Sequence, residues 1–232
     1  VDYGIGRSTA HRDVGEALTL VAEQAPSLHG ALLAARAAGH AHVNLDGTLF
    51  RSDRVSAPGP TTRKNAKSSG PKRVKVDLWW SGKHKCHGGN VQVVTAPDGW
   101  PLWVSDVRPG REHDVTAART DPELLAAVDA WCDEHHKVLA DLGYEGERER
   151  MVVPVKAGTN GKNRAGKPIE LTDDQRCRNA LHSATRARAE QGNARLKQTF
   201  KILRKVRVDP WRIGALAAAA LVLLHILYNR TT

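Results

Sequence analysis

The stretch His42-Val43-Asn44-Leu45-Asp46-Gly47-Thr48 decides how this chain is interpreted. Apolar and polar residues alternate over positions 41–50, which predicts a β-strand with one apolar and one polar face. Asp46 belongs to the polar face, and Gly47 allows the chain to turn or bend after it. The sequence therefore predicts a carboxylate at the end of a strand.

A second stretch repeats this arrangement later in the chain. Val138-Leu139-Ala140-Asp141-Leu142-Gly143-Tyr144 is a short apolar run that ends in an aspartate, with a glycine close behind. Neighbouring strands lie about 4.8 Å apart, so adjacent strand ends would bring the carboxylates of Asp46 and Asp141 within reach of one metal ion. An aspartate before a glycine is also common in turns, so each residue alone has a structural interpretation.

A third acid, Glu190, lies in a basic stretch with helical character. It shares a helix face with Asn193, Lys197 and Lys201, which predicts an exposed, basic face. The apolar stripe on the other side of this helix is expected to pack on the core; it consists of Leu196, Phe200 and Leu203. The alternative interpretation pairs Glu190 with Arg186, one helical turn earlier.

Three separated carboxylates in a basic chain suggest chemistry on nucleic-acid backbones. Two metal ions about 3.5–4 Å apart can activate the attacking oxygen of a phosphodiester reaction and stabilise the leaving one. Magnesium prefers hard oxygen ligands, which Asp and Glu supply. We therefore expect two Mg²⁺ ions, with Mn²⁺ as a substitute, bridged by Asp46 and held on one side each by Asp141 and Glu190.

The whole chain supports an acidic polymer as partner. It has 232 residues, a net charge of +10 and a pI near 9.8. Its three cysteines are scattered, which suggests a reducing compartment and hence a cytoplasmic, nucleoid-associated protein. The apolar run 213–228 is shorter than the ~20 residues of a bilayer span, so we expect a buried core helix and no membrane.

The order of expected elements indicates an α/β fold, a mixed sheet flanked by helices. Residues 39–232 are expected to form this domain. Besides 41–50, strands are expected at 74–80, 90–95, 100–107, 137–141 and 151–155, and loops at 56–75 and 158–167. Helices are expected at 114–132, with a break near Pro122, and from a capping box at Thr172 and Gln175 to about Val206.

Residues 1–38 look like a partial helix-turn-helix. Ser8 is expected to cap a helix that runs to Ala22. In a recognition helix the exposed residues near its start would meet base edges; these are Thr9, His11 and Arg12. The alternative is an amphipathic surface helix with no role in DNA reading.

Basic residues elsewhere suggest contacts with phosphates. The insertion 56–75 has six basic residues and no acid, which fits either an arm that follows DNA phosphates or a solvated, mobile loop. Lys83 and Lys85 fit either a grip on the DNA backbone or a solvated turn. His113 is a candidate phosphate contact, and Asp114 a candidate helix N-cap. Three basic residues of the Glu190 helix are expected to position DNA through phosphates: Arg186, Lys197 and Lys201.

Taken together, the motifs resemble those of a DDE-type insertion-sequence transposase with a Harbinger-like catalytic domain. The similarity covers about residues 40–228 in the expected order. The matching words are Leu45-Asp46-Gly47-Thr48-Leu49, Ser81-Gly82-Lys83-His84-Lys85, Asp98-Gly99, Pro109-Gly110-Arg111-Glu112-His113-Asp114, Leu139-Ala140-Asp141-Leu142-Gly143-Tyr144, and Glu190 with Leu196-Lys197 and Ile202-Leu203-Arg204-Lys205.

This resemblance implies an RNase H-like fold with Asp46, Asp141 and Glu190 as the catalytic triad. It also implies phosphodiester hydrolysis and strand transfer at terminal inverted repeats, with target DNA as second substrate and a homo-oligomer on paired ends. Two departures from the family pattern stand out. The chain begins inside what resembles the helix-turn-helix, and the basic insertion 56–75 is longer than the family's usual connection.

Two other functions are compatible with parts of the sequence. A non-catalytic DNA-binding protein derived from a transposase would share the charge and the fold. Asp46-Gly47-Thr48 also resembles the motif of haloacid-dehalogenase phosphatases, but Asn44 stands where those enzymes have their nucleophilic aspartate. An amide cannot form the aspartyl-phosphate, which argues against that function.

Overall fold

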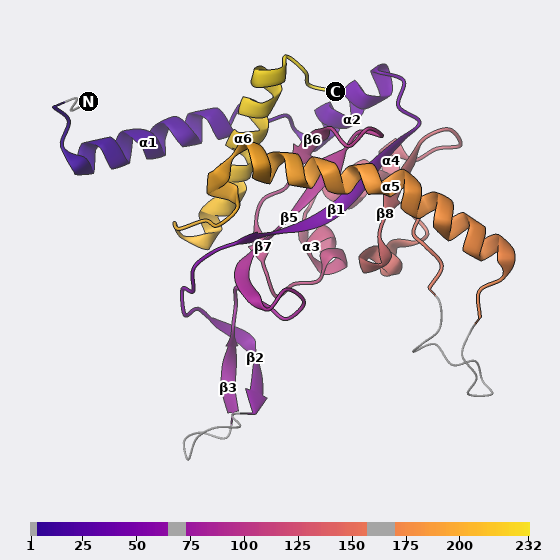
Figure 1. The fold of residues 1–232 in the computed structure, drawn as a ribbon, viewed down its shortest axis with the longest axis horizontal. Coiled ribbons are helices and arrows are strands. Elements are labelled where there is room, and N and C mark those ends of the chain that lie inside the picture. Colours follow the sequence, from indigo (N-terminus) through magenta and orange to yellow (C-terminus); the bar gives the residue numbers. More distant parts are fainter. Residues whose placement is uncertain (1–3, 65–72, 157–169) are drawn as a thin grey trace.

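The computed structural model describes residues 4–64, 73–156 and 170–232 (Figure 1). Its centre is a mixed six-stranded sheet. β1 (His42–Arg51) pairs antiparallel with β5 (Cys86–Thr95) on one side and parallel with β8 (Lys137–Ala140) on the other. Three short strands pair antiparallel with β5: β4 (Trp80–Ser81), β6 (Pro101–Val104) and β7 (Arg108–Pro109).

Helices pack on the sheet from both sides. α5 (Asp173–Thr199) crosses β1, β5, β6 and β8 and supplies the contacts to Asp46 (Figure 1). α3 (Asp114–Thr120) approaches Gly47, and α4 (Leu124–Trp131) contacts β8. Asp46 faces α5, and the next residue, Gly47, faces α3. Since successive strand residues point to opposite faces, the two helices lie on opposite sides of β1. The predicted α/β fold with a mixed sheet flanked by helices is confirmed.

The long helix α5 begins as the sequence predicted and ends earlier. Thr172 Oγ1 accepts a hydrogen bond from the backbone N–H of Gln175 (3.2 Å), and Gln175 Oε1 accepts one from the N–H of Thr172 (3.0 Å). The expected core stripe is confirmed, because Leu196 and Leu203 are fully buried. The helix stops at Thr199 instead of continuing to 206, since Phe200 has an extended backbone. A 3-10 turn, η2 (Lys201–Leu203), follows.

The apolar C-terminal run forms α6 (Ile213–Tyr228), after the short 3-10 turn η3 (Pro210–Arg212). Its side chains Leu216, Leu221 and Leu224 lie in the main core, as expected of a core helix. Within the part of the chain that the structure describes, Pro210–Tyr228 is the one helix long and apolar enough to cross a membrane, and 56% of it is buried. The absence of a membrane role stays a prediction.

The basic insertion is more regular than expected. Residues 58–64 were expected in a mobile loop, but they form β2 (Pro58–Lys64), which pairs antiparallel with β3 (Arg73–Asp77). β3 confirms the first part of the strand expected at 74–80, and residues 65–72 of the expected loop lie outside the described residues. Figure 1 shows this hairpin projecting from the body of the protein. Thr62 pairs with Lys75 and Arg63 pairs with Val74 across it, and threonine and valine favour strands. The prolines are tolerated because a two-stranded ribbon has open edges.

Two other predictions about local structure were wrong, and a third was confirmed in part. Residues 151–155 form only an isolated bridge, Leu139 with Val152, because Pro154 cannot donate to a ladder. The strand expected over 100–107 is confirmed by β6 but is shorter than expected. Ser8 does not cap the first helix, α1 (Arg7–Ala22), since Gly6 holds the N-cap position without a side-chain bond. The expected loop at 158–167 falls outside the described residues.

The N-terminal segment contains a second helix that the sequence did not reveal. α2 (Leu28–Ala37) is capped by Ser27, whose Oγ accepts from the N–H of Gly30 (3.1 Å). It packs on α4 and β6, whereas α1 lies against α6 with most of its surface exposed. The three candidate base-contacting residues of α1 all face solvent: Thr9, His11 and Arg12.

Candidate active site

The pairing of β1 with β8 brings two of the three predicted acids together. Leu45 and Ala140 are partners in the last parallel register pair, so Asp46 and Asp141 follow side by side at the point where β8 ends, which is called the sheet end below. Asp141 caps the 3-10 helix η1 (Leu142–Glu147), and its Oδ1 accepts a hydrogen bond from the N–H of Gly143 (2.7 Å). The expected adjacency of the two aspartates agrees with this register, but the strand end expected at Asp46 was wrong, because β1 continues to Arg51 and only β8 ends here.

Asp46 is held against α5 by two side chains. Asn193 Nδ2 donates to one carboxylate oxygen (2.9 Å), and Arg186 Nη2 donates to the other (3.2 Å). Burial is the main cause that raises the pKa of Asp46 to about 6. The nearby Arg186 opposes this shift, and three further carboxylates add to it, those of Asp141, Asp114 and Glu190. The sheet end therefore concentrates negative charge where the carboxylates are partly shielded from solvent.

Glu190 lies at the border of this group. Its side chain is exposed on α5, four residues after Arg186, and its charge adds to the raised pKa of Asp46. The face that the sequence predicted to be exposed is divided, since Glu190 faces solvent while Asn193 is buried. In residues 4–64, 73–156 and 170–232, no three His, Cys, Asp or Glu side chains are grouped closely enough to hold one ion.

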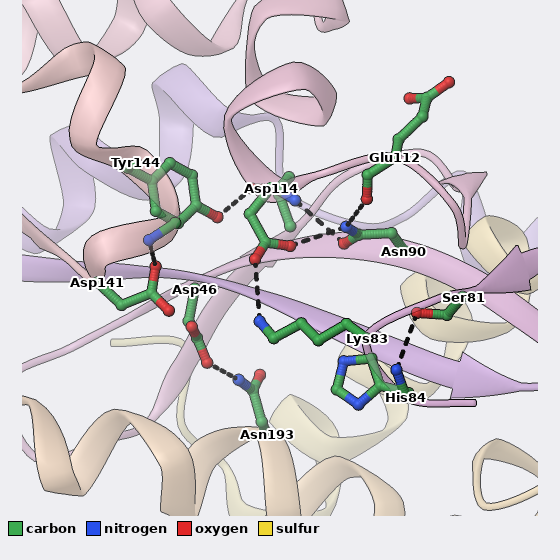
Figure 2. A network of polar contacts seen from close by, with 12 residues as sticks. Asp46, Ser81, Lys83, His84, Asn90, Glu112, Asp114, Asp141, Tyr144 and Asn193 are labelled. Carbon is green, nitrogen blue, oxygen red and sulfur yellow. Dashed lines mark hydrogen bonds and ion pairs between the residues drawn. The ribbon is translucent and has the colours of Figure 1, made fainter. Parts of the chain in front are cut away.

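A fourth acid, Asp114, lies near the site, and the family resemblance had placed it with His113 at the border of the active site. Asp114 was expected to cap α3, but His113 occupies the N-cap position and Asp114 is the first helical residue. Its Oδ1 accepts from Asn90 Nδ2 (2.8 Å), and its Oδ2 lies 3.5 Å from Lys83 Nζ. Figure 2 shows Asp114 close to Asp46 and Asp141. In the sequence, Asp114 stood out as the last residue of the motif Pro109-Gly110-Arg111-Glu112-His113-Asp114, which is one of the motifs that carry the family resemblance.

Several candidate DNA-contacting residues turn inward. Lys197 Nζ donates to Thr48 Oγ1 (2.7 Å) and to the carbonyl of Leu49 (3.2 Å), and burial lowers its pKa. It therefore joins α5 to β1. Arg186, whose side chain is 12% exposed, is similarly occupied by Asp46. The remaining candidates are exposed: Lys83, Lys85, His113 and Lys201.

A cavity of about 420 Å³ is lined by two acids, Asp114 and Glu112, and by the glycines that follow Asp46 and Asp141 closely in sequence, Gly47 and Gly143. Gly47, Asp114 and Gly143 form its side towards the sheet end, and Leu49 and Asn90 are also part of its wall. Four basic side chains line it as well: Lys83, His84, Arg111 and His113. A cavity with acids at one side and basic groups around it fits an anionic substrate that is bound together with cations.

The residues present fit a hard divalent cation. Asp46 and Asp141 supply carboxylate oxygens, the ligand type that Mg²⁺ and Mn²⁺ prefer. Asn193 adds an amide oxygen, Oδ1, which is buried and has no hydrogen-bond partner among the residues that the structure describes. An unsatisfied buried oxygen next to a carboxylate is a further point where a cation would be stabilised.

Comparison with known protein families agrees with this geometry. The family model of the DDE superfamily endonucleases matches residues 45–225, a range that contains Asp46, Asp114, Asp141 and Glu190. The chain therefore belongs to the DDE superfamily endonucleases, and its mixed sheet with flanking helices is the RNase H-like fold expected from the resemblance. Searches among curated proteins and among solved structures each gave no match.

Proposed function

We propose that this protein is a DNA transposase that hydrolyses phosphodiesters at transposon ends and transfers the resulting strands, with a divalent metal. The observation that carries the proposal is the parallel register of β1 and β8, which sets Asp46 beside Asp141. Glu190 is near enough to affect the pKa of Asp46. The family match supports the nuclease part of this proposal.

In this proposal Asp46, Asp141 and Glu190 hold the metal, which is Mg²⁺ with Mn²⁺ as a substitute. When bound, two such ions would activate the attacking oxygen and stabilise the leaving oxygen. The protein's own groups prepare the site. Asn193 fixes the rotamer of Asp46 through its 2.9 Å hydrogen bond, and Arg186 balances the charge of that carboxylate. Ligands fixed in this way need little reorganisation during the reaction.

Double-stranded DNA is the substrate that the charge and the cavity favour. The exposed residues Lys83, His113 and Lys201 would contact phosphates next to the acids, and the basic hairpin and α1 would extend that contact. Terminal inverted repeats and target DNA as the two substrates, and a homo-oligomer on paired ends, follow from the resemblance and form part of the proposal.

A nicking assay on supercoiled plasmid with Mg²⁺ or Mn²⁺ tests the proposal. Asp46→Asn and Glu190→Gln should each lower nicking on the order of 1000-fold, because metal catalysis contributes several kcal/mol. Glu149→Gln removes an equal charge from an exposed position and should leave nicking unchanged. Nicking that persists in both active-site variants would refute the assigned triad.

A non-catalytic DNA-binding protein is the second candidate. The grouping of Asp46 with Arg186 and Asn193, with Glu190 outside it, favours this candidate because both carboxylate oxygens are already bonded to protein side chains. Both candidates predict DNA affinity that falls steeply with salt, since phosphate contacts release counterions. Salt-dependent binding without nicking in any divalent metal would select the second.

A further inference from the structure

A second cavity lies at the root of the hairpin that β2 and β3 form in Figure 1. It has a volume of about 240 Å³, and among the described residues it shares no lining residue with the cavity of about 420 Å³. It is called the hairpin-root cavity below. Its wall combines two aromatic rings, a carboxylate, two basic groups and one apolar residue: Trp80, His87, Asp77, Arg54, Lys75 and Val76.

β4 separates the two cavities. Trp80 lines the hairpin-root cavity, and the next residue, Ser81, lines the larger one. Successive residues of a strand point to opposite faces, so the cavities lie on the two faces of this strand. A ligand that contacts Trp80 would therefore lie close to a substrate in the larger cavity.

Two aromatic rings form a corner of the hairpin-root cavity. Trp80 and His87 are partners across β4 and β5, with ring centroids 5.0 Å apart and ring planes at 66° to each other. Trp80 is half-buried, so part of its ring is open to the cavity. A planar nucleobase stacks well on such a ring, because every base has a π-face.

The Asp77 carboxylate gives the cavity a preference for hydrogen-bond donors. Its Oδ1 accepts from the backbone N–H of Trp79 (2.9 Å), which fixes its orientation. Its Oδ2 is buried and has no hydrogen-bond partner among the described residues. The basic groups beside Oδ2 are His87 Nε2 at 3.8 Å and Arg54 Nε at 3.9 Å, both beyond hydrogen-bond distance. An ionised carboxylate only accepts hydrogen bonds, so it repels a phosphate and stabilises an N–H donor.

Guanine matches this wall better than the other DNA bases. Its Watson–Crick edge presents two adjacent N–H donors, whereas adenine and cytosine each place a ring-nitrogen acceptor beside their amino group. Thymine has a single N–H between two carbonyl oxygens. A carboxylate can accept two parallel N–H bonds, and Oδ1 of Asp77 keeps a lone pair for the second one. A base exposes its Watson–Crick edge only when it is unpaired.

We propose that the hairpin-root cavity binds one unpaired guanine of the DNA, stacked on Trp80 and hydrogen-bonded to Asp77. This inference rests on the proposed function and deepens it, since it names a base that is held next to the reaction. The side chain of Arg54 is 69% exposed, so it moves aside and the base takes its place at Oδ2. Arg54 and the exposed Lys75 then contact phosphates of the same strand.

DNA binding without metal tests the inference. The probes are labelled duplexes of one sequence with a single unpaired residue at the centre, which is guanine, inosine or an abasic site. With EDTA present, fluorescence anisotropy should show guanine bound about 30-fold more tightly than the abasic site, which offers neither stacking nor hydrogen bonds. Inosine lacks the amino group of guanine and should bind about fivefold more weakly than guanine. These comparisons use the unaltered chain, so they do not depend on how a variant folds.

Two variants assign the preference to the cavity. Trp80→Ala should bring the guanine and abasic probes within about threefold of each other, because stacking is lost. Asp77→Asn should remove the difference between guanine and inosine. The matched controls are Trp211→Ala, which removes an exposed tryptophan elsewhere, and Asp53→Asn, which removes an exposed aspartate next to Arg54. Both controls should keep the full preference for guanine.

Guanine and abasic probes bound equally by the unaltered chain would overturn the inference and leave the proposed function intact. A preference for guanine that survives in both variants would also overturn it, because the base would then be held elsewhere. A chain that binds none of the probes even at low salt would refute the proposed function, and the inference with it.

Discussion

The end of the sheet and the middle of α5 hold their acids in different ways. At the sheet end, strand register, the Gly143 amide and the Asn90 side chain fix three carboxylates. On α5, Glu190 is exposed, while its neighbours Arg186 and Asn193 reach inward to Asp46. The carboxylates at the sheet end are thus held in place by the fold itself, and their mutual repulsion destabilises the protein. The position of the Glu190 carboxylate depends instead on how α5 packs on the sheet.

The position of α5 is set by a close contact between two glycines. A Cβ on Gly192 would lie 2.2 Å from the carbonyl oxygen of Gly99, and Gly99 has a φ of +84° in the turn that follows β5. The helix backbone therefore rests directly on this turn. Bringing the three acids of the triad together therefore requires two separate structural features. The register of β1 and β8 places Asp46 beside Asp141, and the packing of α5 on the turn after β5 places Glu190.

The largest stability effect is expected from the charge at the sheet end. The folded pKa of Asp46 is about 6, above its usual 3.8, so ionisation destabilises the metal-free fold as pH rises from about 4 through 6. Asp46→Asn should therefore stabilise the chelator-treated protein at pH 7.5 by about 3 kcal/mol, at 1.36 kcal/mol per pKa unit. Urea unfolding at pH 4 and pH 7.5 measures this difference.

The matching change on α5 sharpens the comparison. Glu190→Gln should alter stability by less than about 0.5 kcal/mol at either pH, as is usual for exposed positions. If Asp46→Asn gave no more stabilisation than Glu190→Gln, the sheet end would not carry the charge repulsion described above.

A somewhat smaller effect is expected at the helix docking contact. Gly192→Ala should destabilise the protein by about 2 kcal/mol and lower nicking, because the new methyl group meets a backbone carbonyl that cannot move aside. Gly15→Ala is the matched helical control, since its Cβ would meet nothing closer than 3.5 Å. That control should lose no stability, given alanine's higher helix propensity. A Gly192→Ala protein as stable and active as its control would break the docking argument.

The smallest stability effect is expected from a comparison of Lys197, in the last turn of α5, with Lys201, just after the helix. Lys197→Met keeps the apolar stem but loses the hydrogen bonds to Thr48 and Leu49, so it should cost about 1 kcal/mol in a urea titration. Lys201→Gln should leave stability unchanged and reduce the salt dependence of DNA binding by about one phosphate contact. Reversed results would show that Lys197, and not Lys201, faces the substrate.

The sequence was most informative where local pattern and tertiary structure coincide. The apolar runs before Asp46 and Asp141 predicted adjacent strands, and the capping box at Thr172 predicted the start of α5. The resemblance placed Asp114 at the border of the site, but its partners Asn90 and Lys83 could not be predicted because they are distant in sequence. Its expected N-cap role was wrong, since His113 holds that position. Arg186 and Lys197 were expected to face DNA, but helical periodicity does not show which face a sheet will cover.

Locating the cation in the protein tests the central claim most directly. Crystals soaked in Mn²⁺ should give an anomalous scattering peak at the end of β8, between the carboxylates of Asp46 and Asp141. Crystals of Asp46→Asn should lack that peak. A protein that binds Mn²⁺ only elsewhere on its surface, with the sheet end empty in well-ordered crystals, would contradict the account.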